Sequence, residues 1–233
     1  MARHRIYLSP SLQQHNPYVT GGVESTHMRE VGNLTRELLN ETGRYVVRMS
    51  PVAWQNLSDS DYLGRVVGDS NTWTADLHIA LHSNAGGAGA AGTDTYYAAG
   101  SAAGKRLATL IQRRVGPVSP GKDHGLHTAD FYELLHTHAP AALVEVAFHT
   151  DPKDAKSIAA TPGLYAMAIA EAVCDYYSEV LKPAGDPLAV PLKKAALAYA
   201  KAHKIVIPDG FNASSPGLGT PARMLFRRIA DKQ

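Results

Sequence analysis

The chain has 233 residues with a formal net charge of +2, and 45% of them are hydrophobic, which suits one full-sized domain plus a small appendage. No stretch approaches the ~20 consecutive apolar residues of a membrane-spanning helix, and Met1 leads into an expected strand without the apolar region of a signal peptide. The single cysteine, Cys174, excludes an intrachain disulfide and a multi-cysteine metal site, and its alanine-rich surroundings predict a core position.

The first half of the chain alternates short apolar runs with longer amphipathic segments. Its first helix is expected to have Ser25 as its N-cap and Gly43 at its C-terminal stop. The apolar face of this helix consists of Met28, Val31, Thr35 and Leu38. The pattern predicts strands over residues 5–9, 45–49 and 77–82, and helices over 25–40 and 57–73.

The second half continues the alternation after a glycine-rich loop over residues 86–92. The run at 142–148 is almost continuously apolar, which is typical of a strand buried on both faces. Other expected elements are a strand over 93–98 and helices over 102–115, with Leu107, Leu110 and Ile111 inward, and 163–180. Together these elements predict an α/β fold: an open mixed, mostly parallel sheet of about six strands with helices on both faces.

A linker is expected at residues 182–190, since two prolines and a glycine fall within 182–187. It divides a main domain, 1–181, from a small helical segment, 191–233. Residues 184–233 hold eight Lys and Arg against three Asp, a net +5, which leaves −3 for the remainder. This asymmetry indicates either an anionic partner for the segment or a solvated helix face.

His82 ends the apolar run of its strand, the position where open α/β sheets bind their ligands. His78 shares its strand face but lies about 13 Å back at ~3.3 Å per residue, which favours a core position over a role as co-ligand. A structural role is the alternative for His82 when it is considered alone.

Three further residues near the N-terminus suit a polar site. Glu24 lies at the start of a helix, just after two glycines, where a negative charge is also favourable for ordinary electrostatic reasons. His15 lies in a polar loop and could equally be a solvated side chain. His27 is three residues after Glu24 on the same helix, so a chelating pair of these two is a rival arrangement.

Glu145 lies inside an apolar strand, and unpaired carboxylates are almost never buried. Burial there would raise its pKa toward neutrality, which suits a general base or acid. A structural ion pair with a lysine or arginine is the alternative. His15, Glu24 and His82 together suggest a zinc site with an open fourth position for water, as in catalytic rather than structural zinc sites.

The chain also resembles the zinc-dependent N-acetylmuramoyl-L-alanine amidases of the amidase type 3 family, typified by bacterial autolysins and phage endolysins. The resemblance covers roughly residues 5–180, with its motifs in order. The motifs are Ile6-Tyr-Leu-Ser-Pro10, Gln14-His-Asn16, Gly21-Gly-Val-Glu24, Leu81-His-Ser-Asn-Ala85, Gly92-Thr-Asp-Thr-Tyr-Tyr97 and Leu143-Val-Glu-Val-Ala-Phe-His-Thr-Asp151.

The resemblance implies that His15, Glu24 and His82 ligate zinc and that Glu145 transfers protons. The sequence departs from the family at three places. A longer loop precedes His15, Ala147 stands where glycine is usual, and His149 replaces an apolar residue on the strand face of Glu145.

The activity that the resemblance implies is hydrolysis of the amide bond between N-acetylmuramic acid and L-alanine in peptidoglycan, in a groove with rims at residues 86–92 and 119–127. His124 and His127 lie there and are expected to be exposed. The alternatives are a zinc carboxypeptidase or peptidase acting on wall peptides, and a non-catalytic wall-binding protein. Nucleic-acid binding is disfavoured because the basic excess is modest and confined to the C-terminal segment.

The C-terminal segment, with helices expected over 192–203 and 221–230, resembles one unit of the S-layer-homology type of wall anchor. It is expected to bind an anionic wall polysaccharide, the alternatives being a hairpin docked on the main domain or a homodimer contact. Without a signal peptide, the protein is expected to be made in the cytoplasm and to act on the wall after release. A phage endolysin fits this expectation first, and a mother-cell enzyme acting after lysis in sporulation comes second.

Overall fold

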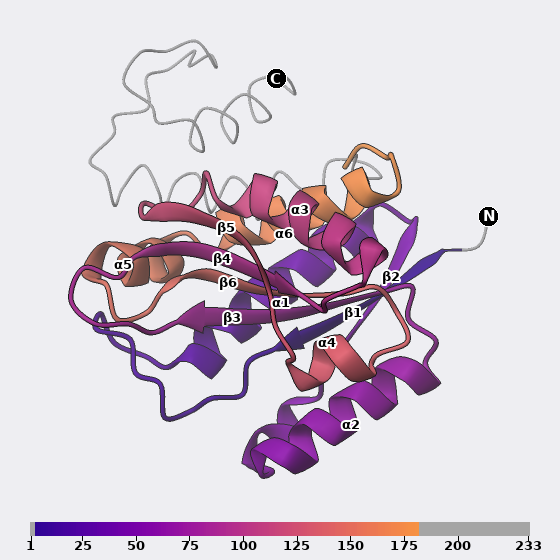
Figure 1. Ribbon diagram of the computed structural model, residues 1–233, viewed down its shortest axis with the longest axis horizontal. Coiled ribbons are helices and arrows are strands. Elements are labelled where there is room, and N and C mark those ends of the chain that lie inside the picture. Colours follow the sequence, from indigo (N-terminus) through magenta and orange to yellow (C-terminus); the bar gives the residue numbers. More distant parts are fainter. Residues whose placement is uncertain (1–2, 182–233) are drawn as a thin grey trace.

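The computed structural model describes residues 3–181, and six strands form its single sheet (Figure 1). The strands are β1 (His4–Pro10), β2 (Tyr45–Met49), β3 (Leu77–Asn84), β4 (Gly92–Tyr97), β5 (Lys122–Thr128) and β6 (Ala141–Phe148). Their spatial order is β2-β1-β3-β6-β4-β5, and neighbours are parallel except β4 and β6, which are antiparallel. This arrangement confirms the open mixed, mostly parallel sheet that the sequence predicts.

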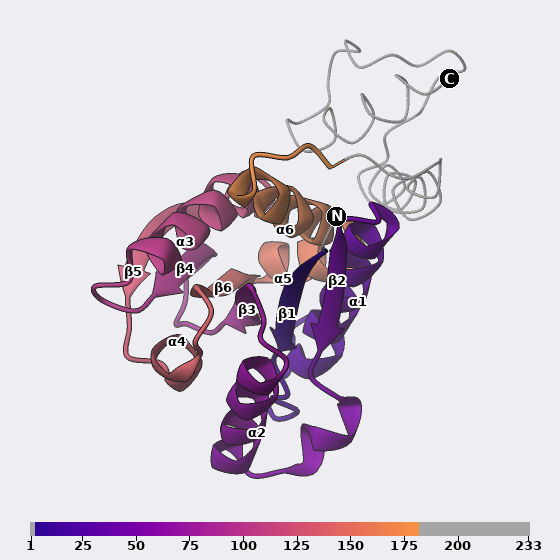
Figure 2. The ribbon, with the colours of Figure 1, turned by 90° about the vertical axis from the view of Figure 1, so that its right-hand side faces the viewer.

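Helices cover both faces of the sheet. They are α1 (Glu24–Glu41), α2 (Asp59–Thr72), α3 (Ala102–Val115), α4 (Tyr132–His136), α5 (Pro152–Ala160) and α6 (Pro162–Tyr176), with a short 3₁₀ helix η1 (Val52–Asn56). On one face α6 contacts both α1 and α3, and on the other α2 contacts α4 (Figures 1 and 2). The main apolar core fills the space between the sheet and the first group of helices.

The first helix begins at Glu24, and the residue before it, Val23, is extended with φ −134° and ψ 159°. The prediction that Ser25 is the N-cap is therefore wrong. The reason is that loop carbonyls replace a capping side chain: the N–H groups of Glu24 and Ser25 donate to the carbonyl oxygens of Asn16 and Gln13. At the other end Gly43 has φ +72°, which confirms the predicted stop.

Glycine at position 32 lets α1 lie close to the sheet. A Cβ there would lie 2.9 Å from both Cγ of Pro10 and Sδ of Met49, so a larger residue would push the helix away from β1 and β2. The close contact keeps the middle of α1 against the carboxyl ends of β1 and β2.

Several elements differ from the sequence prediction. The strand β5 and the helices α4 and α5 were not predicted, and α6 ends at Tyr176 instead of continuing to 180. The side chains of β5 are mostly exposed and polar, so no apolar pattern marks this strand, which pairs only with β4. Thr161, with φ −136° and ψ 48°, and the proline after it separate α5 from α6.

Within residues 3–181, no single helix is long and apolar enough to cross a membrane; α5 and α6 reach that length and composition only as a pair bent by 79°. Cys174 is buried in the core, as predicted. The expected linker over 182–190 and the helical segment over 191–233 lie outside the described residues.

Candidate active site

The carboxyl ends of β3 and β6 bring two of the predicted residues together. His82 and Glu145 are register partners on these adjacent parallel strands. Just beyond them, the register shifts by one residue, so that Asn84 pairs with Phe148. This irregularity ends the regular pairing and leaves His82 and Glu145 as neighbours at the carboxyl ends of two inner strands.

Glu24 joins this pair from the start of α1. Its Oε1 lies 3.0 Å from Nδ1 of His82 and accepts the N–H of Ser83 at 3.1 Å. Its Oε2 accepts a hydrogen bond from the amide of Asn16 at 2.7 Å. Although burial raises the pKa of Glu24, these hydrogen bonds lower it below its ordinary value, so the buried carboxylate is negatively charged.

The acidic neighbours of His82 raise the pKa of its imidazole. Burial lowers its pKa, but the hydrogen bond to Glu24 and the charge of Glu145 outweigh burial and raise the pKa of His82 to about 9. In this state, the Nδ1–H group of His82 donates a hydrogen bond to Oε1 of Glu24. The same nitrogen is free to ligate a metal only when that proton is absent.

Glu145 has no ion pair with a lysine or arginine among the described residues, which disfavours the structural alternative. Its Oε2 is buried and makes no hydrogen bond. Burial raises the pKa of Glu145 to about 7, against the lowering effect of His82. A carboxyl group with this pKa exchanges its proton readily near neutral pH.

Asp94 is a residue of this site that the sequence analysis did not single out. It pairs with Glu145 from the antiparallel strand β4, so His82, Glu145 and Asp94 form one row across three strands. Asp94 is buried, accepts a hydrogen bond from Asn84 at 3.2 Å, and lies 3.0 Å from Nε2 of His127. Its only signal in the sequence was its place in the motif Gly92-Thr-Asp-Thr-Tyr-Tyr97.

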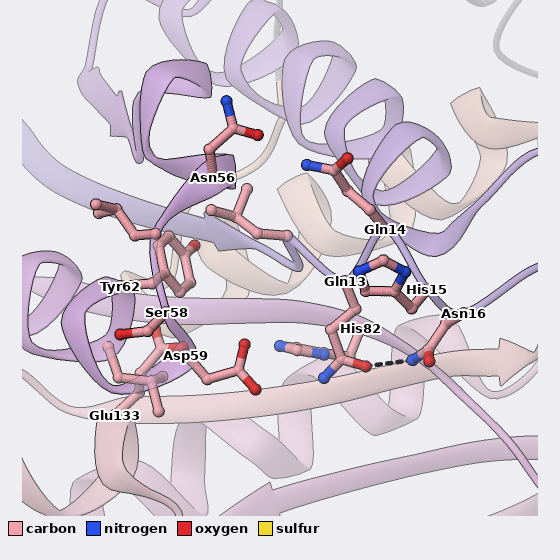
Figure 3. A pocket seen from close by; sticks show the side chains of 13 residues that line it. Gln13, Gln14, His15, Asn16, Asn56, Ser58, Asp59, Tyr62, His82 and Glu133 are labelled. Atoms are coloured by element: carbon pink, nitrogen blue, oxygen red, sulfur yellow. Dashed lines mark hydrogen bonds between the residues drawn. The ribbon is translucent and has the colours of Figure 1, made fainter.

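A cavity of about 750 Å³ opens beside His82, and His15 lines it from the loop between β1 and α1 (Figure 3). Loop residues Gln14, His15 and Asn16 lie on one side of this view, and Ser58, Asp59 and Tyr62 lie on the other. His15 is exposed, as expected of a side chain in a polar loop. The volume is in the range of small-molecule and peptide side-chain sites.

The distances between these side chains can be compared with those between the ligands of a zinc ion. Nδ1 of His82 and Oε1 of Glu24 lie 3.0 Å apart, close to the ~3.4 Å that separates two ligand atoms 2.0–2.1 Å from a tetrahedral zinc. No group of three His, Cys, Asp or Glu side chains in the described part of the chain is close enough together to hold a metal. His82 and Glu24 thus fit zinc in chemistry and spacing. His15, the third predicted ligand, lines the cavity that opens beside His82.

Two other histidines lie close to this site without joining it. Nε2 of His27 lies 3.2 Å from the carbonyl oxygen of Gly21, and its ring lies against Tyr18, so the rival pairing with Glu24 is not formed. Nδ1 of His149 lies 2.8 Å from the carbonyl oxygen of Ser83. His149 therefore links the residue after β6 to Ser83, whose N–H donates a hydrogen bond to Glu24.

The chain is also similar to known proteins. Residues 6–175 match the family model described as N-acetylmuramoyl-L-alanine amidase. The N-acetylmuramoyl-L-alanine amidase LytC of Bacillus subtilis (strain 168) is 35% identical over 108 residues, which are 44% of this chain and 22% of LytC. The matched regions span between 22% and 51% of the curated relatives, so the chain corresponds to only part of each.

Solved structures show the same fold. The N-acetylmuramoyl-L-alanine amidase from Clostridium difficile 630 has a TM-score of 0.68 at 20% identity, covering 76% of this chain and 98% of that chain. The catalytic domain of the CD27L endolysin, which targets Clostridia difficile, has a TM-score of 0.62 at 21% identity, covering 74% and 98%.

Proposed function

The chain belongs to the N-acetylmuramoyl-L-alanine amidase family, and we propose on that premise that it is a zinc-dependent peptidoglycan hydrolase. Its substrate is the amide bond between the lactyl group of N-acetylmuramic acid and L-alanine. Water adds to the carbonyl carbon, the C–N bond breaks, and the products are a carboxylate on the sugar and a free amine on the peptide.

The observation that carries this proposal is the grouping of Glu24, His82 and Glu145 at the carboxyl ends of β3 and β6. Two of them present an imidazole nitrogen and a carboxylate oxygen 3.0 Å apart, and the third holds a buried carboxylate oxygen without a hydrogen-bond partner. This combination supports a metal-ligand pair beside a separate proton carrier.

Glu24 and His82 would hold the zinc ion, with His15 contributing from the loop between β1 and α1. A zinc ion bound there supplies a Lewis acid that polarises the amide carbonyl and activates water. The bonds from Asn16 and the N–H of Ser83 orient the Glu24 carboxylate, which reduces the entropy lost when it ligates.

Glu145 is the proton carrier in this proposal. Its carboxylate accepts a proton from the attacking water at Oε2, the oxygen without a partner, and then donates that proton to the nitrogen of the leaving L-alanine. Its pKa of about 7 suits both directions, because neither the charged nor the protonated form is strongly favoured at neutral pH.

The experiment that tests this function is the turbidity loss of a purified Gram-positive wall suspension, measured with the protein as purified, after chelation, and after zinc is added back. Clearing that the chelator stops and zinc restores supports a zinc-dependent wall hydrolase. Mass spectrometry of the digest then identifies the bond: a new free amine on L-alanine supports the amidase, whereas a bond cut within the peptide supports a carboxypeptidase or peptidase. No clearing of several wall types by zinc-loaded protein would contradict the proposal.

We also propose that the protein reaches the wall after release from the cell, as a phage endolysin. The fold similarity to the catalytic domain of the CD27L endolysin is compatible with this role. Binding of residues 184–233 to an anionic wall polymer is a further part of the proposal, motivated by their net charge of +5. Co-expression with and without a membrane-permeabilising holin tests the route: lysis only with the holin supports it.

A further inference from the structure

A buried polar network lies beneath the candidate active site, on the α2 and α4 side of the sheet. His78 of β3 is fully buried, and its Nε2 lies 2.6 Å from Oε2 of Glu133 on α4. Its Nδ1 lies 3.0 Å from the hydroxyl of Ser70 on α2. Tyr7 stacks on the imidazole with ring centroids 5.3 Å apart, so the ring has one orientation.

Among the described residues, no hydrogen bond joins this network to Glu24 or Glu145, and its only link to His82 is the charge of Glu133, which raises the pKa of His82. A buried pair of this kind is weak evidence for stability. Burying an ionisable pair requires removing both groups from water, and apolar residues of the same volume often stabilise a core equally well. Glu133 is only 2% exposed, yet it lines the cavity that opens beside His82. The imidazole of His78 therefore holds a carboxylate at the wall of a cavity, where a ligand can meet it.

The remaining lining of the cavity suits a peptide. Amide side chains, including Gln13, Gln14 and Asn56, line it together with apolar leucines and a second carboxylate, that of Asp59 (Figure 3). The described residues that line it include no lysine or arginine that would neutralise Glu133. A ligand with an ammonium group can make a charge-assisted hydrogen bond to a carboxylate held in this way.

We propose that this cavity binds the stem peptide of the substrate and that Glu133, held by His78, recognises the side-chain ammonium of the diamino acid at the third stem position. This inference rests on the proposed function, since it takes peptidoglycan as the substrate. Glu133 is then a specificity-determining residue, separate from the residues that hold zinc or move protons.

The dimensions of the strand agree with this assignment. His78 and His82 are four residues apart on β3, or about 13 Å at ~3.3 Å per residue. Three extended peptide residues span about 10 Å, and a lysine side chain adds several ångströms of reach. A stem whose first amide lies at His82 therefore places the third side chain near the His78 and Glu133 pair.

Direct binding of two synthetic peptides tests the inference without requiring catalysis. The peptides are L-Ala-D-isoGln-L-Lys and L-Ala-D-isoGln-L-norleucine, both as C-terminal amides, titrated calorimetrically into the full-length protein. We expect the lysine peptide to bind about tenfold more tightly, a ratio equivalent to about 1.4 kcal/mol. Equal affinity of the wild-type protein for the two peptides would overturn the inference, whether or not any variant folds.

The variant Glu133→Gln assigns the preference to this residue. It keeps the size of the side chain and an oxygen for His78 but removes the charge, so the lysine preference is expected to fall to within about twofold. The matched control Glu37→Gln removes an exposed carboxylate of α1 and is expected to keep the full preference. A folded Glu133→Gln protein that retains the preference would contradict the role of Glu133.

Cleavage assays separate this inference from the proposed function. N-acetylmuramoyl derivatives of the same two peptides are incubated with zinc-loaded protein, and release of free L-alanine amine is measured. Cleavage of both at equal kcat/KM supports the amidase and overturns the stem specificity. Lysine-selective binding without cleavage of either derivative supports the cavity assignment and contradicts the amidase.

Discussion

At the scale of single residues, Glu145 lies between His82 and Asp94 in one row across β3, β6 and β4. His82 favours the negative charge of Glu145, whereas Glu24 and Asp94 oppose it. Burial decides the balance and raises the pKa of Glu145 to about 7. Asp94, in contrast, is hydrogen-bonded by Asn84 and close to His127, which leaves Glu145 as the carboxyl group with an unpartnered oxygen.

Replacing Glu145 with glutamine is expected to reduce kcat by about 10²-fold or more, because the variant cannot accept a proton from water. Zinc content should be unchanged, since the proposed ligands are elsewhere. Both quantities can be measured, by muropeptide cleavage and by elemental analysis, with Glu37→Gln as the control. An active Glu145→Gln protein would disprove the proton-transfer role, and loss of zinc would indicate that Glu145 is a ligand.

Replacing His82 with alanine should remove a zinc ligand. We expect zinc affinity to fall by more than about 100-fold, beyond the 10–100-fold typical of groups that only orient a ligand. Competition with a fluorescent chelator measures this affinity. The control is His124→Ala, which changes an exposed histidine of β5 bonded to the carbonyl oxygen of Ala91. Stoichiometric, tightly held zinc in His82→Ala would exclude ligation by this residue.

The thiol of Cys174 gives a prediction about pH. Burial raises its pKa to about 11, above the value of 9.0 for a free thiol. The folded protein thus holds this proton more tightly than the unfolded chain. The resulting stabilisation is complete below about pH 9 and is lost as the pH rises toward 11. At pH 8 the native protein should not react with a disulfide reagent within minutes, whereas protein in guanidinium should; rapid labelling of the native protein would contradict this.

At the scale of elements, Asp154 of α5 joins parts of the chain that are distant in sequence. Its carboxylate accepts the N–H groups of Gly92 at 2.6 Å, Phe148 at 3.0 Å and Gly121 at 3.1 Å. These groups lie at the start of β4, at the end of β6 and just before β5. One buried side chain therefore fixes the ends of three strands close to the candidate active site.

We expect Asp154→Ala to lower the free energy of unfolding by about 3 kcal/mol or more, because each unsatisfied buried donor costs about 1–3 kcal/mol. The matched change Asp151→Ala removes only the N-cap of α5, where the side chain accepts the N–H groups of Lys153 and Asp154. It should cost about 1 kcal/mol. Urea denaturation followed by circular dichroism measures both. Equal losses for the two variants would show that the Asp154 network contributes little.

At the scale of the whole molecule, the sheet order places β1, β3 and β6 side by side, with α1 beginning at their carboxyl ends. Residues from three separate parts of the chain meet there: Glu24, His82 and Glu145. The antiparallel strand β4 then adds Asp94 from the opposite direction. The candidate site thus forms because the strand order brings these residues together.

Large apolar residues from all parts of residues 3–181 are buried together in one core. We therefore expect a chain ending at residue 183 to fold. It should cleave soluble muropeptides with kcat/KM within about twofold of the full chain. If residues 184–233 anchor the protein to the wall, the shortened chain should no longer sediment with purified walls. Sedimentation equal to that of the full chain would contradict anchoring, and loss of solubility or of a dimer would favour a structural role for the segment.

The sequence by itself determined five of the six strands and the four longest helices, because apolar periodicity depends on local geometry. It also singled out Glu145 and His82, since a carboxylate in an apolar strand and a histidine at a strand end are unusual in local terms. Only the tertiary structure decided the contacts that depend on strand order: the row from His82 to Asp94, and the pairing of His78 with Glu133. It also decided that polar β5 is a strand, because pairing with β4 holds it in place while its mostly exposed side chains leave no apolar pattern in the sequence.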